Sequence, residues 1–424
     1  MTAPHDAYQA LRIVGFRRYL AGNVLGTIGH QMQSVAIGWE LYERTRSPLA
    51  LGLVGLVQVV PLLLLFLPVG HLVDRYDRRR VLIGAEAGLA LTAFGLAAVS
   101  ALHGPIPLVY LLLTVNGAAR AFQGPAKSAL LPEIVPVRVF QNAVTWNSGG
   151  WQVADVVGPA LGGVLIAASG GASAVYVANG VAALLFLLLL RRVPTDAAPR
   201  RVPVASLSAL LEGVRYVRKS EVLFGAITLD LFAVLFGGAV ALLPVFAKDI
   251  LHVGPAGLGW LLAAQSIGAV LMALALAHRP PLRRAGPVLL WSVAAFGAAT
   301  IVFGLSRSFV LSFAALAAAG AADSISVVIR ATLAQLGTPV ELRGRVSAIN
   351  SLFIGMSNEL GGFESGAVAA LAGPVFAVVS GGVGTIAVVG IVAARWKPLA
   401  TLGRMEGLAG NGERGTGNGE TVGV

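Results

Sequence analysis

The chain is a succession of long apolar segments separated by short turns. A helix needs ~20 mostly apolar residues to cross the hydrocarbon core of a membrane. Segments of about that length recur along the sequence, and turn signals such as SPL, HGPIP and SRS part them. The pattern predicts twelve membrane-spanning helices, at about 17–42, 49–71, 81–102, 106–127, 140–168, 172–190, 222–247, 256–278, 286–305, 309–333, 345–370 and 373–394.

Composition supports a membrane protein. Apolar residues make up 56% of the chain and charged residues 12%, whereas a soluble domain has roughly 25% charged residues. Glycine, at 53 of 424 residues, is about twice as frequent as the usual ~7%, and small residues let helices approach closely in a membrane. The lack of cysteine excludes a disulfide framework, thiol catalysis and a cysteine-based metal site.

The distribution of Lys and Arg predicts the orientation. Cytoplasmic loops of membrane proteins carry an excess of these residues. If the N-terminus is inside, most of the 31 Lys and Arg residues lie in inside segments. We therefore expect a multi-pass protein of the inner (cytoplasmic) membrane with both termini in the cytoplasm. The net charge of +11 is then explained by the bilayer and not by nucleic acid. The basic residues left for outside segments are Arg44, Arg46, Lys248 and Arg307.

A long loop at 191–221 divides six predicted spans from six. Helical apolar spacing in its second half predicts a helix on the inner membrane surface. SPLALGLVGLVQ at 47–58 and GPAGLGWLLAAQ at 254–265 share Pro, Leu-Gly and Gln at one constant offset, which indicates a duplicated unit. Duplicated halves are typical of secondary transporters, whose substrate site lies near the midplane between them. We expect a six-helix bundle at 1–190, the linker at 191–221, a second six-helix bundle at 222–400 and a disordered tail at 401–424.

Three motifs carry a resemblance to a known family. GHLVDRYDRRR, at 70–80, resembles the loop 2–3 signature G-x-x-x-D-R-x-G-R-R of the major facilitator superfamily, with Asp77 in place of the usual glycine. RAFQGP, at 120–125, looks like the span-4 signature of its proton-driven members, and GPALGG, at 158–163, resembles the span-5 signature of its exporters. The wider pattern is similar to the bacterial branch that holds enterobactin exporters and macrolide efflux proteins. The resemblance implies an all-α integral membrane fold with twelve transmembrane helices in two pseudo-symmetric six-helix bundles.

The resemblance also implies roles for the motif residues. The loop would act as a cytoplasmic gate, with Asp74 accepting hydrogen bonds from Arg75 or Arg78 or capping a helix N-terminus; the alternative for the arginines is that they only hold the topology. The expected gate residues are Gly70, Asp74, Arg75, Arg78 and Arg79. The expected structural kink in span 5 comprises Gly158, Pro159, Gly162 and Gly163.

Polar side chains inside the spans recur at three-four spacing and so fall on single helical faces. Such faces are costly against lipid and normally line a cavity or meet a partner. They occur in spans 1, 4 and 5, and we expect them to line a water-filled pathway. The expected cavity residues are Asn23, Thr27, His30, Asn116, Gln123 and Gln152.

Acidic residues within the spans are candidates for proton coupling. Asp230 stands among apolar neighbours in span 7, and low dielectric favours a neutral carboxyl group, so it is a candidate proton carrier; the alternative is a structural hydrogen bond. Asp155 and Asp323 are further candidates, and Arg120 is expected to act electrostatically because arginine does not deprotonate. Arg330, near the cytoplasmic end of its span, is expected only to snorkel.

The sequence favours transport over catalysis. No HExxH, Walker or GxSxG motif occurs, so we expect no enzyme activity, no cofactor and no metal site. With the resemblance, this predicts a monomeric, proton-coupled antiporter that exports small amphipathic organic molecules of drug, macrolide or siderophore type by alternating access. The expected partners are the small-molecule substrate, protons and the lipid bilayer. The alternatives are a lysolipid flippase of the same fold and a non-transporting membrane sensor.

Overall fold

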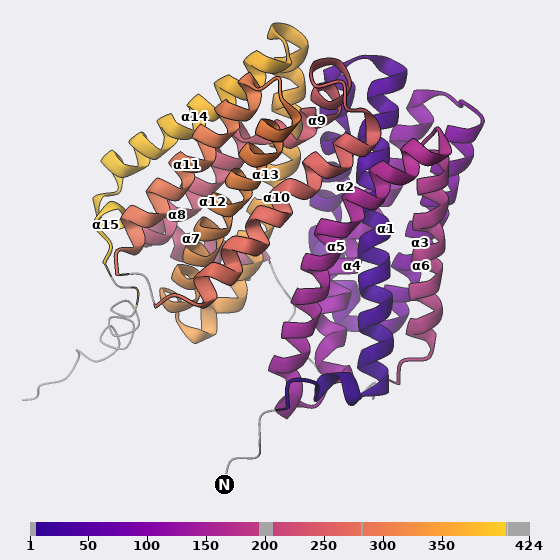
Figure 1. The fold of residues 1–424 in the computed structure, drawn as a ribbon. Helices are drawn as coiled ribbons and strands as arrows, with labels where there is room; N and C mark the ends of the chain where they lie inside the picture. Colours follow the sequence, from indigo (N-terminus) through magenta and orange to yellow (C-terminus); the bar gives the residue numbers. More distant parts are fainter. Residues whose placement is uncertain (1–5, 195–206, 281–282, 404, 406–424) are drawn as a thin grey trace, which may run out of the picture. The chain divides into compact units, whose positions relative to one another are not determined.

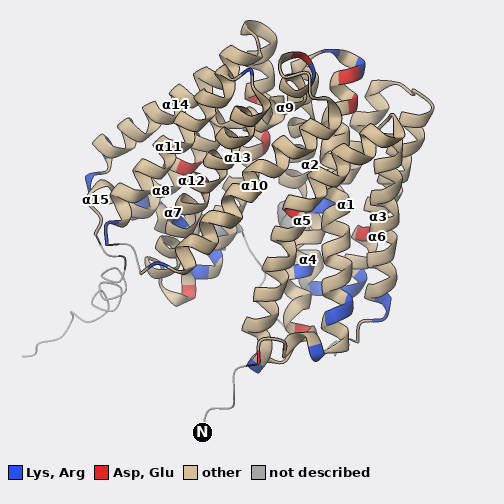
Figure 2. Ribbon diagram, viewed as in Figure 1, with Lys and Arg blue, Asp and Glu red and all other residues tan. Residues whose placement is uncertain are grey.

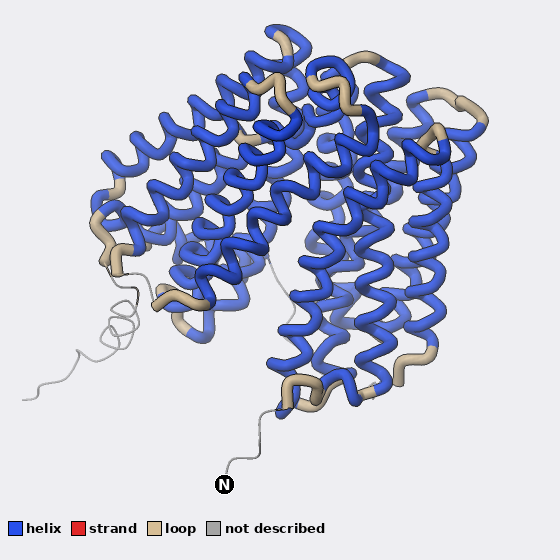
Figure 3. The backbone as a smooth tube through the Cα atoms, viewed as in Figure 1, coloured by secondary structure: helices blue, strands red, loops and turns tan. Residues whose placement is uncertain are grey.

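Helices make up all the regular structure in the described part of the chain, where no strand occurs (Figure 3). The computed structural model describes residues 6–194, 207–280, 283–403 and 405. Within that range the side chains of Phe66, Leu67, His71, Asp74 and 207–210 also lie outside the description. The expected disordered tail at 401–424 falls almost entirely outside the described residues.

The chain forms two compact units, and the first contains the N-terminal helices together with part of the second half. It comprises Met1–Ala205, Val240–Ser266 and Arg307–Phe309. Its long helices run alongside one another (Figure 1), with α1 against α5 and α6, and α4 against α2 and α3. They are α1 (Val14–Thr45), α2 (Pro48–Arg75), α3 (Arg78–Ala101), α4 (Ile106–Ile134), α5 (Phe140–Ser169) and α6 (Ser173–Arg191), joined by α9 (Leu243–Val245), the π-helix η4 (Phe246–Ile250) and the first half of α10 (Gly254–Ala277).

The second unit comprises Ser206–Ala239, Ile267–Ser306 and Val310–Val424. In it α11 packs against α14, and α8 packs against α13 and α14. Its helices are α7 (Leu207–Lys219), α8 (Glu221–Phe236), α11 (Ala285–Leu305), α12 (Phe309–Leu336), α13 (Arg343–Ala372), α14 (Pro374–Arg395) and the short α15 (Lys397–Ala400), with the second half of α10. Val240–Ser266 thus belong to the first unit, and the two six-helix halves expected from the sequence stay a prediction.

Most predicted spans agree with the helices to within a few residues, but α4 continues past the predicted end at 127 to Ile134. The span predicted at 222–247 is not a single helix: α8 ends at Phe236, and the short helices η3 (Gly238–Leu242), α9 and η4 follow it. Over the described residues, nine helical segments are long and apolar enough to cross a membrane, and Glu221–Ile250 counts as one of them. The helices α1, α4 and α13 have comparable lengths but are less apolar. Polar and charged side chains within α1, α4 and α13 lower their hydropathy, which is why composition alone does not identify them as spans.

Local chemistry explains several helix ends. Asp77 is the N-cap of α3, and its carboxylate accepts hydrogen bonds from the backbone N–H groups of Arg79 (2.9 Å) and Arg80 (3.3 Å). Such a cap satisfies donors that the first turn leaves without partners. The residue that departs from the glycine of the superfamily signature therefore starts the helix. At the other end of the first unit, Gly170 ends α5 in the left-handed conformation, with φ of +74°.

Glycines of the predicted kink bring α5 close to its neighbours. A Cβ atom at Gly162 would lie 2.9 Å from the Cα of Met32 in α1, and one at Gly163 would meet the backbone of Pro255 and Gly259 at the start of α10. Pro159 lies inside the unbroken α5. The kink itself stays a prediction, while the close approach accounts for the small residues.

Candidate functional site

A cavity of about 490 Å³ lies in the first unit, lined by α1, α4 and α5. Five of the six residues predicted to face a cavity line it, and all come from polar faces at three-four spacing. They are Asn23, Thr27, His30, Gln123 and Gln152. The sixth, Asn116, is 1% exposed and donates instead to the hydroxyl of Thr92 in α3 at 3.0 Å. Asn116 therefore ties α4 to α3 and does not line the cavity.

Neighbouring side chains hold the cavity wall in place. The amide of Asn23 donates to Oδ1 of Asn147 in α5 at 2.9 Å, and the amide of Gln123 donates to Oε1 of Glu86 in α3 at 2.7 Å. Arg120 donates to Oε1 of Gln58 in α2 at 3.1 Å. The wall is therefore supported by hydrogen bonds to partners on three different helices, an arrangement that pre-organises a binding site.

Lys127, on the polar face of span 4 that periodicity predicts to line the pathway, also lines the cavity. The ammonium group of Lys127 lies 5.3 Å from the ring centroid of Phe186 in α6, in a cation–π contact. Sequence reasoning missed three further lining residues, Tyr19, Asn147 and Trp151. Trp151 lies three residues after Ser148 on the polar face of α5, so the periodicity held a signal for it.

Asp155 lies one turn beyond Gln152 on α5 and has a different environment. Its carboxylate accepts a hydrogen bond from the amide of Gln31 in α1 and another from the hydroxyl of Ser266 in α10, at 2.5 Å. Both donors are neutral. Asp155 thus joins three helices of the first unit, and a change in its protonation would change both contacts.

In the second unit Asp230 forms a buried ion pair. Its carboxylate on α8 contacts the guanidinium of Arg330 on α12, and the two side chains are 9% and 12% exposed. Asp323, two turns before Arg330 on the same face of α12, has an oxygen 3.7 Å from the same guanidinium and is 43% exposed. Arg330 is therefore shared by two carboxylates. The expectation that Arg330 only snorkels is wrong, because a carboxylate distant in sequence lies beside it.

The expected gate loop makes its described contacts within the first unit. Arg78 pairs with Glu133 near the end of α4, and Arg79 donates to the carbonyl oxygen of Val193 after α6, at 2.7 Å. Gly70 lies within α2 and Arg75 is exposed. The side chain of Asp74 lies outside the described residues. Two of the arginines therefore connect the start of α3 to the ends of two other helices.

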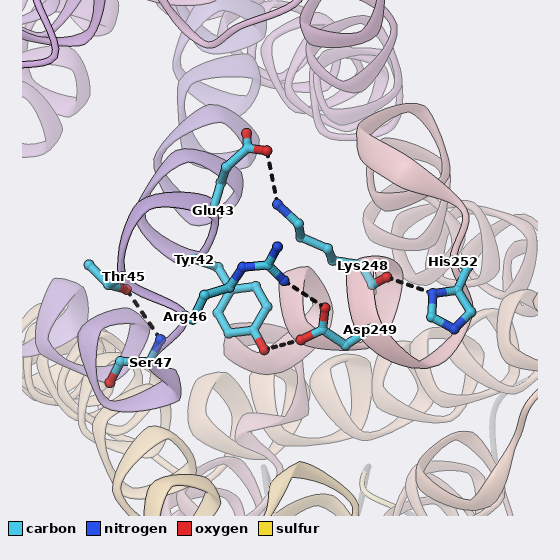
Figure 4. Close-up of polar contacts among 8 residues, drawn as sticks. All are labelled: Tyr42, Glu43, Thr45, Arg46, Ser47, Lys248, Asp249 and His252. Carbon is cyan, nitrogen blue, oxygen red and sulfur yellow. Dashed lines mark hydrogen bonds and ion pairs between the residues drawn. The ribbon is translucent and has the colours of Figure 1, made fainter.

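A second charged cluster joins the end of α1 to η4 (Figure 4). We call it the α1–η4 cluster; it consists of Tyr42, Glu43, Arg46, Lys248 and Asp249. Lys248 pairs with Glu43 at 2.9 Å, Arg46 pairs with Asp249 at 3.0 Å, and the hydroxyl of Tyr42 donates to Asp249. In the first unit, charged residues gather near the helix ends and are sparse along the helices (Figure 2). This cluster and the gate loop lie at opposite ends of the helices, at Thr45 of α1 and at the start of α3.

Known proteins with similar sequences are named as membrane transporters. Residues 5–402 match a family described as transmembrane secretion effector. The uncharacterised MFS-type transporter YfiS of Bacillus subtilis (strain 168) is 28% identical, over 78% of this chain and 81% of its own. The enterobactin exporter EntS of Citrobacter koseri is 27% identical, over 90% of each chain.

Solved structures show the same fold. A bacterial homologue of the human lysosomal transporter Spinster has a TM-score of 0.70 and 14% identity, covering 94% of this chain and 98% of its own. The xylose transporter XylE of E. coli has a TM-score of 0.66 and 14% identity, covering 96% and 100%. The fold is the twelve-helix membrane fold of the major facilitator superfamily, and the family match spans nearly the whole chain. The chain belongs to the transmembrane secretion effector family of this superfamily of membrane transporters.

Proposed function

We propose that the protein is a proton-coupled antiporter that exports small amphipathic organic molecules across the inner membrane. The observation that carries the proposal is the polar cavity of about 490 Å³ in a chain whose helices are otherwise apolar. A cavity of this volume lies within the range of small-molecule sites, roughly 300–1,000 Å³. A relative of 27% identity is named as an exporter of the siderophore enterobactin, which supports efflux as the direction of transport. The protein would act as a monomer with both termini in the cytoplasm.

The charge arrangement in the second unit supports proton coupling. Asp230 and Asp323 share the single guanidinium of Arg330. Asp230 forms the close ion pair, and Asp323 forms the longer one. A carboxylate without a close cation takes up a proton more readily than one in a close ion pair. We therefore assign the proton to Asp323, with Asp230 and Arg330 as the pair that positions it. Asp155 and Arg120 in the first unit are the further candidates for coupling.

The gate loop would change its contacts during the cycle. Arg78 and Arg79 hold α3 to α4 and α6 in the structure, so we infer that these two arginines anchor the loop. Asp74 and Arg75 remain the residues proposed to engage and release. Alternating access then requires only that the anchored end of the loop stays with its own helices while the free end exchanges partners.

Transport into reconstituted vesicles tests the proposal. With an imposed pH gradient, the wild type should accumulate a fluorescent organic dye or a siderophore, and Asp323→Asn should reduce this uptake to the level of empty vesicles. Exchange of labelled for unlabelled dye needs no net proton movement, so Asp323→Asn should retain it. Asp6→Asn, which removes a carboxylate paired with Arg12 near the N-terminus, is the control and should behave like the wild type. Gradient-driven uptake by Asp323→Asn at the wild-type rate would remove Asp323 from the coupling mechanism.

A further inference from the structure

We propose that the cavity between α1, α4 and α5 selects aromatic organic anions, which makes these the substrate class of the transporter. That these ligands are transported rests on the proposed function. The binding preference itself is argued from the cavity alone. It narrows the amphipathic molecules expected from the sequence, because it disfavours cationic drugs.

The charges of the cavity wall are the first evidence. Arg120 and Lys127 both line the cavity, and none of the described lining residues is Asp or Glu. Glu86 is the acid behind the wall; it is 1% exposed and accepts a hydrogen bond from Gln123. Glu86 offsets one of the two positive charges. The wall therefore keeps a net positive charge, and His30 adds a neutral or positive group.

The carboxylate of Asp155, which lies near the cavity, does not cancel the positive charge at the cavity surface. Asp155 lies beyond Gln152 and is held by Gln31 and Ser266, and it is not among the lining residues. Its two described hydrogen bonds are accepted from residues of α1 and α10 and not from a residue that lines the cavity. A ligand in the cavity would therefore meet the cations first.

Positive charge within a membrane span is costly, and such residues normally serve a ligand or an ion pathway. A cleft with low-dielectric walls and charge of one sign also concentrates ligands of the opposite sign. Arg120 offers a planar set of donors suited to carboxylate, and Lys127 adds a point charge two turns further along the same face of α4. Hydrogen bonds from charged donors are roughly twice as strong as neutral ones. An anionic group is the ligand feature that this pair recognises best.

The remaining wall indicates the rest of the ligand. Tyr19, Trp151 and Leu131 supply aromatic and apolar surface, and Trp151 is 53% exposed. The amides of Asn147 and Gln152 supply donors and acceptors. Flat rings pack well against such side chains. A molecule of a few fused rings with one acidic group matches the cavity in both size and chemistry.

Two dyes of nearly the same shape and opposite charge test the inference. Fluorescein is an anion and rhodamine 123 a cation, and both carry a three-ring xanthene. Binding of each to the full chain in neutral detergent is measured by fluorescence anisotropy at pH 7. We expect fluorescein to bind at least ~10-fold more tightly than rhodamine 123, since one charge-assisted hydrogen bond contributes about that factor. Added salt should weaken fluorescein binding.

Variants of Lys127 separate charge from fold. Lys127→Gln should abolish most of the preference for fluorescein, and Lys127→Arg should keep it. Lys219→Gln removes a charge from the exposed end of α7 and should have no effect. Undetectable binding of fluorescein, an equal affinity for rhodamine 123, or an unchanged preference in a folded Lys127→Gln protein would each overturn the inference.

The binding assay and the vesicle assay can fail independently. Selective fluorescein binding that depends on Lys127, in a protein that moves nothing across vesicles, would keep the anion site and refute the exporter. Gradient-driven transport of rhodamine 123 without fluorescein binding would keep the exporter and refute the anion site.

Discussion

At the scale of single residues, the ion pair of the second unit should be essential for stability. Asp230 and Arg330 are nearly buried, and removing one partner of a buried pair leaves an uncompensated charge, at a cost of ~3–5 kcal/mol. Arg330→Gln should therefore lower the free energy of unfolding by about that amount. Asp323, 3.7 Å from the guanidinium, would be left without its cation as well.

Denaturant unfolding of the detergent-solubilised protein measures this effect. The double variant Arg330→Gln/Asp230→Asn, which removes both charges, should recover most of the loss, because neutral polar side chains can hydrogen-bond to each other. Arg345→Gln is the control, since its partner Glu212 is 54% exposed and exposed pairs contribute little. Equal stability of Arg330→Gln and the wild type would show that the pair is solvated in solution.

At the scale of helices, the packing of α5 against α10 should depend on Gly163. A Cβ atom there would meet the backbone of Pro255 and Gly259, and backbone cannot rotate out of the way. Gly163→Ala should lower the free energy of unfolding by ~1–3 kcal/mol, as overpacking commonly does. Gly149→Ala on the same helix is the matched control, because no atom lies within 4 Å of a Cβ there. It should be neutral or stabilising by up to ~1 kcal/mol. The same free energy of unfolding for both variants would mean that α5 and α10 do not pack closely.

The helices themselves follow from the sequence, because length and hydropathy are local properties. The predicted span at 140–168, for example, is the helix Phe140–Ser169. Side-chain partners are not local. Sequence periodicity placed Asn116 on a polar face but could not distinguish a cavity from the hydroxyl of Thr92 on a neighbouring helix. For the same reason Asp230 looked isolated, since Arg330 reaches it from a helix far along the chain.

At the scale of the whole molecule, the orientation in the membrane stays a prediction from the distribution of Lys and Arg. Three of the four basic residues expected outside are paired with acids: Arg44 with Glu40 at 3.1 Å, and Arg46 and Lys248 within the α1–η4 cluster. Basic residues expected inside are paired too, Arg78 with Glu133 and Arg80 with Asp77. Ion pairing therefore does not distinguish the two sides, and the excess of Lys and Arg on one side is the signal for the orientation.

Cysteine labelling tests this orientation at the two ends of α4, which is one of the three long helices that composition does not identify as spans. Leu102, before α4, is 81% exposed, and Val137, after it, is 93% exposed. Neither is charged, so replacing them leaves the charge distribution unchanged, and the natural chain has no cysteine to label. A membrane-impermeant maleimide applied to intact spheroplasts should label Leu102→Cys, and Val137→Cys only after the membrane is permeabilised. Labelling of both from outside would mean that α4 does not cross the membrane. The reverse pattern would place the gate loop, which lies at the same end of the helices as Val137, on the outer side of the membrane.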